Sequence, residues 1–240
     1  MARPRFWWQV FTAALHSHSN RQFYDRISPI YDRVFVKHRK HAQNMTEIMR
    51  TAYAGRERMT RVLDLGCGTG MLSRMLAADG SDVTGLDISL KSLQVMRRSD
   101  KRIEAIQGDA SHLPFTDDAF QVVVSLGSWR HFSEPEQVLA ELNRLLGKNG
   151  FFIAGYFPPA IGGVVHLVNG FWSRLLIRIY HFLTGKLGFE DHADSLLEER
   201  TTILARKYFK QVDTVDSGEK WHLIVAIDPC TSLINTVSSE

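Results

Sequence analysis

Cysteine and long apolar runs are both scarce in this chain of 240 residues. It has only two cysteines, Cys67 and Cys230, so neither a disulfide framework nor a cysteine-based zinc site can be built from them. No apolar stretch is both long enough and free enough of charge to span a bilayer, since the best candidate, 160–183, contains Arg174 and Arg178. These absences favour a reducing compartment, and we expect a cytoplasmic protein.

The charge of the chain is small overall but unevenly spread. The net charge is +3, yet residues 1–60 hold eleven Lys/Arg against four Asp/Glu (11 − 4 = +7), and the remainder holds eighteen against twenty-two (18 − 22 = −4). Within this basic arm the apolar residues recur at helical spacing, as in an amphipathic helix: Phe6, Trp7, Val10, Phe11 and Ala14. The arm could meet an anionic membrane surface, a nucleic acid or an acidic substrate, or simply present a solvated helix face.

From residue 61 onward, short apolar runs alternate with helical patterns. The predicted strands are 61–65, 82–86, 102–107, 121–126 and 151–156, and the predicted helices are 71–78, 90–98 and 135–146. This alternation predicts βαβ units, and therefore a parallel sheet with helices on both faces. Two further runs, 208–215 and 221–227, predict a hairpin that adds an antiparallel strand to the sheet.

A glycine-rich loop, Asp64-Leu-Gly-Cys-Gly-Thr-Gly70, joins the first predicted strand to the first predicted helix. Glycines there allow a sharp turn and a close approach to a ligand. Asp64 precedes them and would repel a phosphate but attract an ammonium group. Asp87 ends the second strand, where its carboxylate could accept both ribose hydroxyls, and Asp109 follows the third, within reach of an adenine amino group. The pattern favours an adenosyl amino acid as cofactor.

In order and spacing, residues from about 60 to 157 resemble the class I S-adenosylmethionine-dependent methyltransferases. The glycine loop looks like their motif I, and 109–125 and 131–139 are typical of the type-11 subgroup. The resemblance implies a Rossmann-like α/β fold, a seven-stranded sheet of order 3-2-1-4-5-7-6 with strand 7 antiparallel, and S-adenosyl-L-methionine as cofactor. We expect it to be bound by Asp64, Gly66, Cys67, Gly68, Thr69, Gly70, Asp87, Ile88, Asp109, Ala110 and Ser125. Two alternatives stay open, that Asp64 only orients the loop and that Cys67 only fills the turn.

The basic arm carries a second resemblance. Its segment Phe23-Tyr-Asp-Arg-Ile-Ser-Pro-Ile-Tyr-Asp32 is similar to the arm that precedes motif I in ubiquinone/menaquinone C-methyltransferases and in some bacterial phospholipid N-methyltransferases. That similarity implies that Tyr24 and Tyr31 line the pocket, although both tyrosines could instead anchor a helix on the core. We predict an N-terminal helical arm or cap at 1–58 and a methyltransferase domain at 59–240.

An aromatic helical insert is predicted at about 158–190, where the family places its acceptor-binding cap. It lacks the tyrosine- and serine-containing signature of the quinone enzymes. Its apolar segment could lie at a membrane interface, roof a pocket or pack into the core. For a catalytic base, His131 is the first candidate because it closely follows the fourth strand, and the weaker candidates are His166, His181 and His192.

The sequence therefore predicts methyl transfer to a small lipophilic acceptor, such as a quinone precursor, a phenol or a lipid headgroup. A soluble-metabolite methyltransferase is the first alternative. A nucleic-acid methyltransferase using the basic arm is the second, disfavoured because no interleaved Lys/Arg–aromatic module is found. A non-catalytic interaction module is disfavoured by the intact acids and glycines. Peripheral contact with the inner membrane face stays open, and no metal is expected.

Overall fold

A computed structural model of the chain describes residues 4–34, 37–52, 60–156, 194–216 and 222–230. The predicted insert at 158–190, with Arg174, Arg178 and the histidines 166, 181 and 192, lies outside these residues. The predicted boundary between 58 and 59 also lies outside them, so the division into arm and domain stays a prediction.

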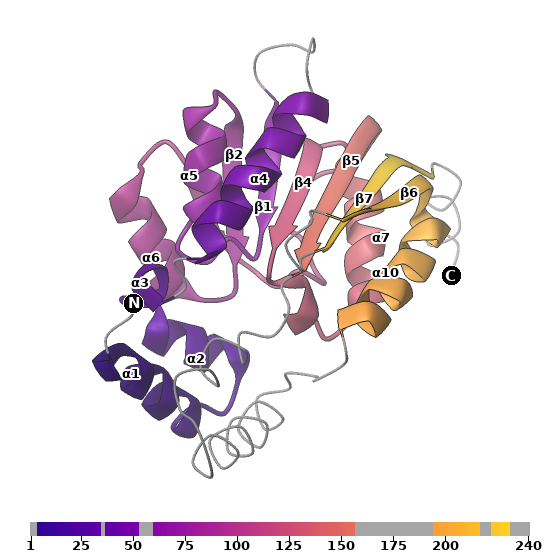
Figure 1. Cartoon of the computed structure of the whole chain (residues 1–240). Coiled ribbons are helices and arrows are strands. Elements are labelled where there is room, and N and C mark those ends of the chain that lie inside the picture. The colour runs from indigo at the N-terminus through magenta and orange to yellow at the C-terminus, as the bar shows by residue number, and fades with distance from the viewer. Residues whose placement is uncertain (1–3, 35–36, 53–59, 157–193, 217–221, 231–240) are drawn as a thin grey trace.

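Seven strands form one sheet of order β3-β2-β1-β4-β5-β7-β6 (Figure 1). The central strand β1 pairs in parallel with β2 and β4, and β7 runs antiparallel to both β5 and β6. The predicted sheet order and the predicted terminal hairpin are therefore confirmed. The strands are β1 (Arg61–Leu65), β2 (Asp82–Asp87), β3 (Glu104–Gln107), β4 (Phe120–Leu126), β5 (Leu146–Tyr156), β6 (Phe209–Asp216) and β7 (His222–Pro229).

Helices cover both faces of the sheet (Figure 1). On one face lie α4 (Lys37–Ala52), α5 (Met71–Ala78) and α6 (Leu90–Ser99), and on the other lie α7 (Pro135–Leu145) and α10 (Asp194–Tyr208). Successive side chains of β1 point to opposite faces of the sheet. Val62 packs in a first cluster of buried residues, under α4, α5 and α6. Leu63 packs in a second cluster, under α7 and α10. Helix α4 joins the first cluster through Met45, which is fully buried.

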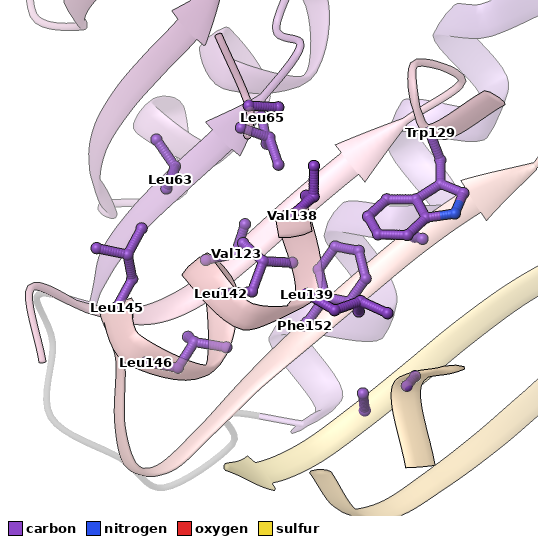
Figure 2. Packing of buried hydrophobic residues seen from close by; sticks show 14 of the residues in the cluster. Leu63, Leu65, Val123, Trp129, Val138, Leu139, Leu142, Leu145, Leu146 and Phe152 are labelled. Atoms are coloured by element: carbon purple, nitrogen blue, oxygen red, sulfur yellow. The ribbon is translucent and has the colours of Figure 1, made fainter. Parts of the chain in front are cut away.

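The second cluster fixes the segment that follows β4. Trp129 lies in a single 3₁₀ turn, η1 (Trp129–His131), and its ring packs against Phe152 of β5 at a centroid distance of 5.2 Å (Figure 2). The indole Nε1 donates a hydrogen bond to Thr201 Oγ1 at 2.9 Å. Burying an aromatic ring of this size contributes roughly 1.5–3 kcal/mol. Because His131 ends the same turn, the core fixes its position.

Three short helices of the arm lie beyond the carboxyl ends of the strands (Figure 1). They are α1 (Pro4–Leu15), α2 (Asn20–Ile27) and α3 (Tyr31–Val34). Ala13, Phe23 and Ile27 form a small core of their own between α1 and α2. No helix within the described ranges is long and apolar enough to cross a membrane.

Some boundaries differ from those predicted. Strand β5 begins at Leu146, not at Phe151, and Leu146 already pairs with Phe120 before the register shifts. Asn149 and Gly150, which separate the predicted helix 135–146 from the predicted strand 151–156, therefore lie at an irregularity inside a strand. Asn149 has φ of 61°, a left-handed conformation that asparagine tolerates better than most residues. Helix α10 and the turn η1 were not predicted.

Candidate active site

The glycine loop turns sharply at the end of β1 and is held by backbone hydrogen bonds. The N–H groups of Gly66 and Cys67 both donate to the Leu86 carbonyl, at 2.8 and 3.1 Å. Gly66 has φ of +73°, and a Cβ there would lie 2.4 Å from Ser128 Cβ. At Gly68 (φ +55°) a Cβ would meet no heavy atom within 4 Å. The loop is thus closed behind Gly66 and open above Gly68, where a ligand can approach the backbone.

Asp87 joins this loop to the start of α6. Its Oδ2 accepts a hydrogen bond from Gly68 N and its Oδ1 accepts one from Ser89 N, both at 2.8 Å. Burial raises the pKa of Asp87, and these two hydrogen bonds oppose the rise. Each carboxylate oxygen has a further lone pair, so Asp87 can also accept hydroxyl groups of a ligand. Beside it, Ile88 leaves 41% of its surface exposed and offers an apolar contact.

Asp64 lies one layer deeper, with 1% of its surface exposed. Ser73 Oγ, in the first turn of α5, donates a hydrogen bond to Asp64 Oδ2 at 2.5 Å. Burial raises the pKa of Asp64 to about 7 despite this bond. In the free protein the carboxyl therefore orients α5 and is only partly ionised near neutral pH. A cationic group placed next to it would favour the ionised form.

Ser125 and Cys67, two further predicted cofactor-binding residues, are buried next to the glycine loop. Ser125 is fully buried, with its Oγ 2.9 Å from Ser128 Oγ, and Ser128 Oγ donates to the Leu65 carbonyl at 3.0 Å. Ser125 thus contacts a residue that supports the loop, and its role in cofactor binding stays a prediction. Burial raises the pKa of the Cys67 thiol, and its Sγ lies 2.8 Å from where a Cβ of Gly85 would stand. Cys67 thus packs inside the turn, and its predicted contact with the cofactor stays a prediction.

The third predicted acid is the most exposed. Asp109 lies on the surface, and its Oδ1 accepts hydrogen bonds from Ser111 N at 3.0 Å and Ser111 Oγ at 2.8 Å. Its neighbour Ala110 is buried in the core. Asp109 follows β3, so it stands at the same sheet edge as Asp87, which ends the neighbouring strand β2. Its carboxylate keeps acceptor capacity for a ligand at this edge.

The arm brings two tyrosines to this edge. Tyr24 Oη lies 3.0 Å from His131 Nε2, and the two rings meet edge to face at 5.7 Å. Burial, and secondarily the charge of Arg130, lower the pKa of His131 to about 3, so the imidazole is neutral at physiological pH. Tyr31 packs against Tyr24 at a centroid distance of 6.2 Å. Burial and the nearby Asp87 carboxylate raise the pKa of Tyr31.

Two aspartates of the arm were missed by sequence reasoning. Thr69 Oγ1, in the glycine loop, donates a hydrogen bond to Asp32 Oδ1. Arg74 forms an ion pair with Asp32 at 3.1 Å and donates to the Thr69 carbonyl at 2.6 Å. Asp25 Oδ1 accepts hydrogen bonds from Ser89 Oγ at 2.6 Å and from the first turn of α6. The signal that could have pointed to them is a repeated triplet, Tyr-Asp-Arg, at 24–26 and 31–33.

This geometry can be compared with known proteins. Residues 63–154 match the family model described as a methyltransferase domain. This match and the relatives below support a class I methyltransferase domain of the type-11 kind over these residues. A demethylmenaquinone methyltransferase of Thermus thermophilus is 34% identical to it over 135 residues, 53% of this chain and 61% of the relative. One from Renibacterium salmoninarum is 40% identical over 103 residues, 42% of this chain and 44% of the relative. The chain thus spans less than two thirds of the length of these relatives.

Solved structures share the fold of the methyltransferase domain. A protein of Pyrococcus horikoshii OT3 has a TM-score of 0.60 at 24% identity, covering 83% of this chain and 98% of that one. A Haemonchus contortus phosphoethanolamine N-methyltransferase, solved with S-adenosylhomocysteine, has a TM-score of 0.58 at 15% identity, covering 78% of this chain and 53% of that one. At these identities the likeness shows the fold alone.

S-adenosylmethionine is the cofactor that a methyltransferase domain implies, and the residues present fit it. The open space above Gly68 leaves room for a ligand against the backbone. Asp87 retains acceptor capacity for hydroxyl groups, and the exposed side chain of Ile88 suits a flat, apolar ring. The edge thus offers separate polar and apolar surfaces to an adenosyl group.

Proposed function

We propose that this protein transfers a methyl group from S-adenosylmethionine to a small lipophilic acceptor. The observation that carries the proposal is a convergence at one sheet edge. The donor-binding features of Gly68 and Asp87 lie at the carboxyl ends of β1 and β2, and the pair Tyr24–His131 closes over the end of β4. One edge thus combines a nucleoside site with a neutral hydrogen-bonding pair.

We assign binding of the methyl donor to the edge of the sheet formed by the carboxyl ends of β1 and β2. Gly68 provides the close backbone approach, Asp87 accepts the ribose hydroxyls, and Asp109 lies within reach of the adenine. When bound, S-adenosylmethionine supplies a methyl group activated by a sulfonium charge. The deep carboxyl of Asp64 balances the ammonium group of the donor or, as the alternative, only orients the glycine loop and the start of α5.

The acceptor side is assigned to the arm. Some acceptor atoms carry a proton that must leave when the new bond to the methyl group forms. The neutral His131 ring can accept that proton, directly or through the Tyr24 hydroxyl, and release it to solvent. Because burial disfavours the imidazolium, His131 would hold the proton only briefly.

The acceptor class is inferred from the lining and from the relatives. Tyr24 and Tyr31 present aromatic rings beside the donor edge, which favours an apolar or aromatic acceptor. The demethylmenaquinone methyltransferases among the relatives make a quinone precursor or phenol the first choice, and a lipid headgroup the next. A soluble metabolite is the alternative from another class. A nucleic-acid acceptor bound through the basic arm is the least favoured.

Donor binding is tested by calorimetry with S-adenosylmethionine. The wild type should bind, and Asp87→Ala should weaken binding at least 100-fold, because it removes the ribose acceptor and the acceptor of Gly68 N together. Asp100→Ala is the matched control, since Asp100 pairs with the exposed Arg102 at the far end of α6. No binding by the wild type would sink the proposal.

Acceptor identity is tested by transfer of a labelled methyl group. A prenylated hydroquinone, a short soluble catechol and phosphoethanolamine are offered in parallel, each with detergent. We expect the prenylated hydroquinone to be methylated fastest. A higher rate with the soluble catechol or with phosphoethanolamine would replace the lipophilic acceptor with that class.

We further propose that the arm rests on an anionic membrane surface. Trp8, Phe11 and Leu15 lie on one side of α1 at spacings of three and four, and Trp8 and Leu15 are 64% and 46% exposed. The opposite side packs on the small core of the arm. The exposed charged side chains between residues 8 and 33 are all cationic, namely Arg21, Arg26 and Arg33. The two aspartates of this range are partly buried against the loops that they bind. This combination is typical of interfacial helices.

Flotation with vesicles tests this proposal. At low salt the wild type should float with phosphatidylserine vesicles and stay behind with phosphatidylcholine vesicles. Trp8→Ser combined with Leu15→Ser should abolish flotation, whereas Ile203→Ser, at an equally exposed position on α10, should not. A wild type that stays with the soluble fraction at low salt contradicts the membrane proposal and leaves the methyl-transfer proposal intact.

A further inference from the structure

We propose that Asp25 and Asp32 are positioning residues that fasten the arm to the two donor-binding loops and so couple donor binding to closure of the acceptor side. The coupling rests on the proposed function, whereas the fastening can be tested without any ligand. Each aspartate follows a tyrosine of the site directly, at Tyr24-Asp25 and Tyr31-Asp32. Where the carboxylates are held, the tyrosines are held too.

Asp32 fastens the arm to the glycine loop. One carboxylate oxygen accepts the Thr69 hydroxyl and the other pairs with Arg74, which also holds the Thr69 carbonyl. Thr69 is 2% exposed, and the side chains of Arg74 and Asp32 are only 27% and 38% exposed, so solvent screens this triangle less than an open surface pair. The carboxylate also lies at the N-terminus of α5, where the helix dipole favours a negative charge.

Asp25 fastens the arm to the next loop. Ser89 is the N-cap of α6, and its hydroxyl accepts from Ser92 N while donating to Asp25 Oδ1. The Lys91 N–H in the first turn of α6 also points at Asp25, at 3.3 Å. Asp25 therefore stands at a second helix N-terminus, next to the Ser89 N–H that Asp87 holds.

The two attachment points border the donor site from both sides. Thr69 follows Gly68, the open point of the loop, and Ser89 lies two residues after Asp87. A donor bound between these two loops would lie next to the residues that hold the arm, and so would stabilise the docked arm. If the donor strengthens docking of the arm by a given factor, linkage requires that the docked arm raise donor affinity by the same factor. The docked arm also places the Tyr24 hydroxyl on His131.

The first test measures hydrogen exchange of the arm in the ligand-free protein. We expect residues 20–33 to exchange at least tenfold faster in Asp25→Asn combined with Asp32→Asn than in the wild type. Asp32→Glu should protect residues 20–33 better than Asp32→Asn does, since it keeps the charge facing Arg74. Asp100→Asn, which removes a carboxylate paired with the exposed Arg102 at the other end of α6, is the control.

A second test measures the coupling with S-adenosylhomocysteine as probe. The probe should slow exchange of residues 20–33 in the wild type and much less in the double variant, whose dissociation constant should rise about tenfold. When the donor is saturating, the double variant should also have a lower kcat than the wild type, because Tyr24 is no longer held. Circular dichroism must show an unchanged fold.

The outcomes separate the two proposals. Unchanged exchange of residues 20–33 in the ligand-free double variant overturns the fastening role of the two aspartates. A wild type that binds neither S-adenosylmethionine nor S-adenosylhomocysteine overturns the proposed function and the coupling with it, while faster exchange in the variant would still establish the fastening. Equal probe affinity in wild type and variant, with faster exchange in the variant, overturns the coupling alone.

Discussion

The glycine loop and the arm meet at the same site but are held there by different means. The loop is bound through its backbone, as Gly66 N and Cys67 N donate to Leu86 O inside the sheet. The arm is bound to the sheet edge through side chains, chiefly the carboxylates of Asp25 and Asp32 and the hydroxyl of Tyr24. The loop is therefore part of the rigid core. In the arm, α4 also packs in the core, whereas the position of α1 to α3 at the sheet edge depends on a few polar contacts.

This difference separates what each region contributes. A backbone-held loop keeps one geometry whatever its side chains are, provided that glycine stands at the positive φ positions. A side-chain-held arm can dock and release without unfolding the sheet, since only a few contacts must break. The loop suits a constant ligand, the methyl donor, and the arm suits the admission of an acceptor.

A methyl group at Gly66 should disrupt the glycine loop more than any other change proposed for this site. Gly66→Ala would place a Cβ at φ +73° and 2.4 Å from Ser128 Cβ, so the backbone must move. We expect donor affinity to fall more than 100-fold and stability to fall by roughly 1–3 kcal/mol. Calorimetry and thermal unfolding measure the two losses.

Gly80→Ala is the matched control for this change. Gly80 also has a positive φ, +96°, but a Cβ there would meet nothing within 4 Å, and it lies after α5, away from the loop. It should lose some stability through backbone strain and keep its donor affinity. If Gly66→Ala bound the donor as well as Gly80→Ala, the rigid role of the loop would be wrong.

An intermediate effect is expected at the arm. Tyr24→Phe keeps the ring that packs on His131 but removes the hydroxyl 3.0 Å from Nε2. We expect kcat to fall about 10- to 100-fold with little change in donor affinity, since proton-transfer groups contribute at this scale. Steady-state kinetics with the best acceptor, alongside calorimetry, separates the two. Tyr208→Phe, at the end of α10, should match the wild type.

The pH dependence of activity tests whether His131 is neutral. The pKa of His131 is lowered to about 3, so the ring stays neutral as the pH falls through 6.5, where an ordinary histidine gains its proton. The wild type should therefore not lose activity near pH 6.5 through protonation of His131. Its pH profile should have the same shape through this range as the profiles of Tyr24→Phe and His131→Asn. A titration of His131 near pH 6.5, observed by NMR, would contradict the neutral pair.

The two regions also differ in how far sequence alone predicts them. Glycine spacing and the acids that end strands follow from local rules, so the sequence alone predicts the places of Gly66, Gly68 and Asp87. The repeated Tyr-Asp-Arg triplet marks Asp25 and Asp32, but their partners lie 64 and 37 positions away, and no local pattern indicates those partners. The tyrosines were named only through a resemblance. Ser125 is predicted at the ligand, whereas its burial and its contact with Ser128 follow from three-dimensional packing.

The smallest expected effect lies beneath the loop, at Asp64. Its pKa is raised to about 7 in the folded chain, so the folded state holds the proton more tightly than the unfolded state does. The stability linked to this proton is complete below about pH 4 and is lost as the pH rises through 7. Asp64→Asn cannot ionise, yet its amide oxygen can still accept the Ser73 hydroxyl.

We therefore expect the Tm of Asp64→Asn, relative to wild type, to rise by a few degrees between pH 5 and pH 8. Asp100→Asn is the control, because the pKa of Asp100 is lowered to about 2 by its bonds to Arg102 and the group does not titrate in this window. If Asp64 also balances the donor ammonium, the same variant should bind S-adenosylmethionine more weakly while being more stable. A variant that gains stability at pH 8 and keeps full donor affinity would leave Asp64 with the structural role alone, since its carboxyl would then serve only to orient α5.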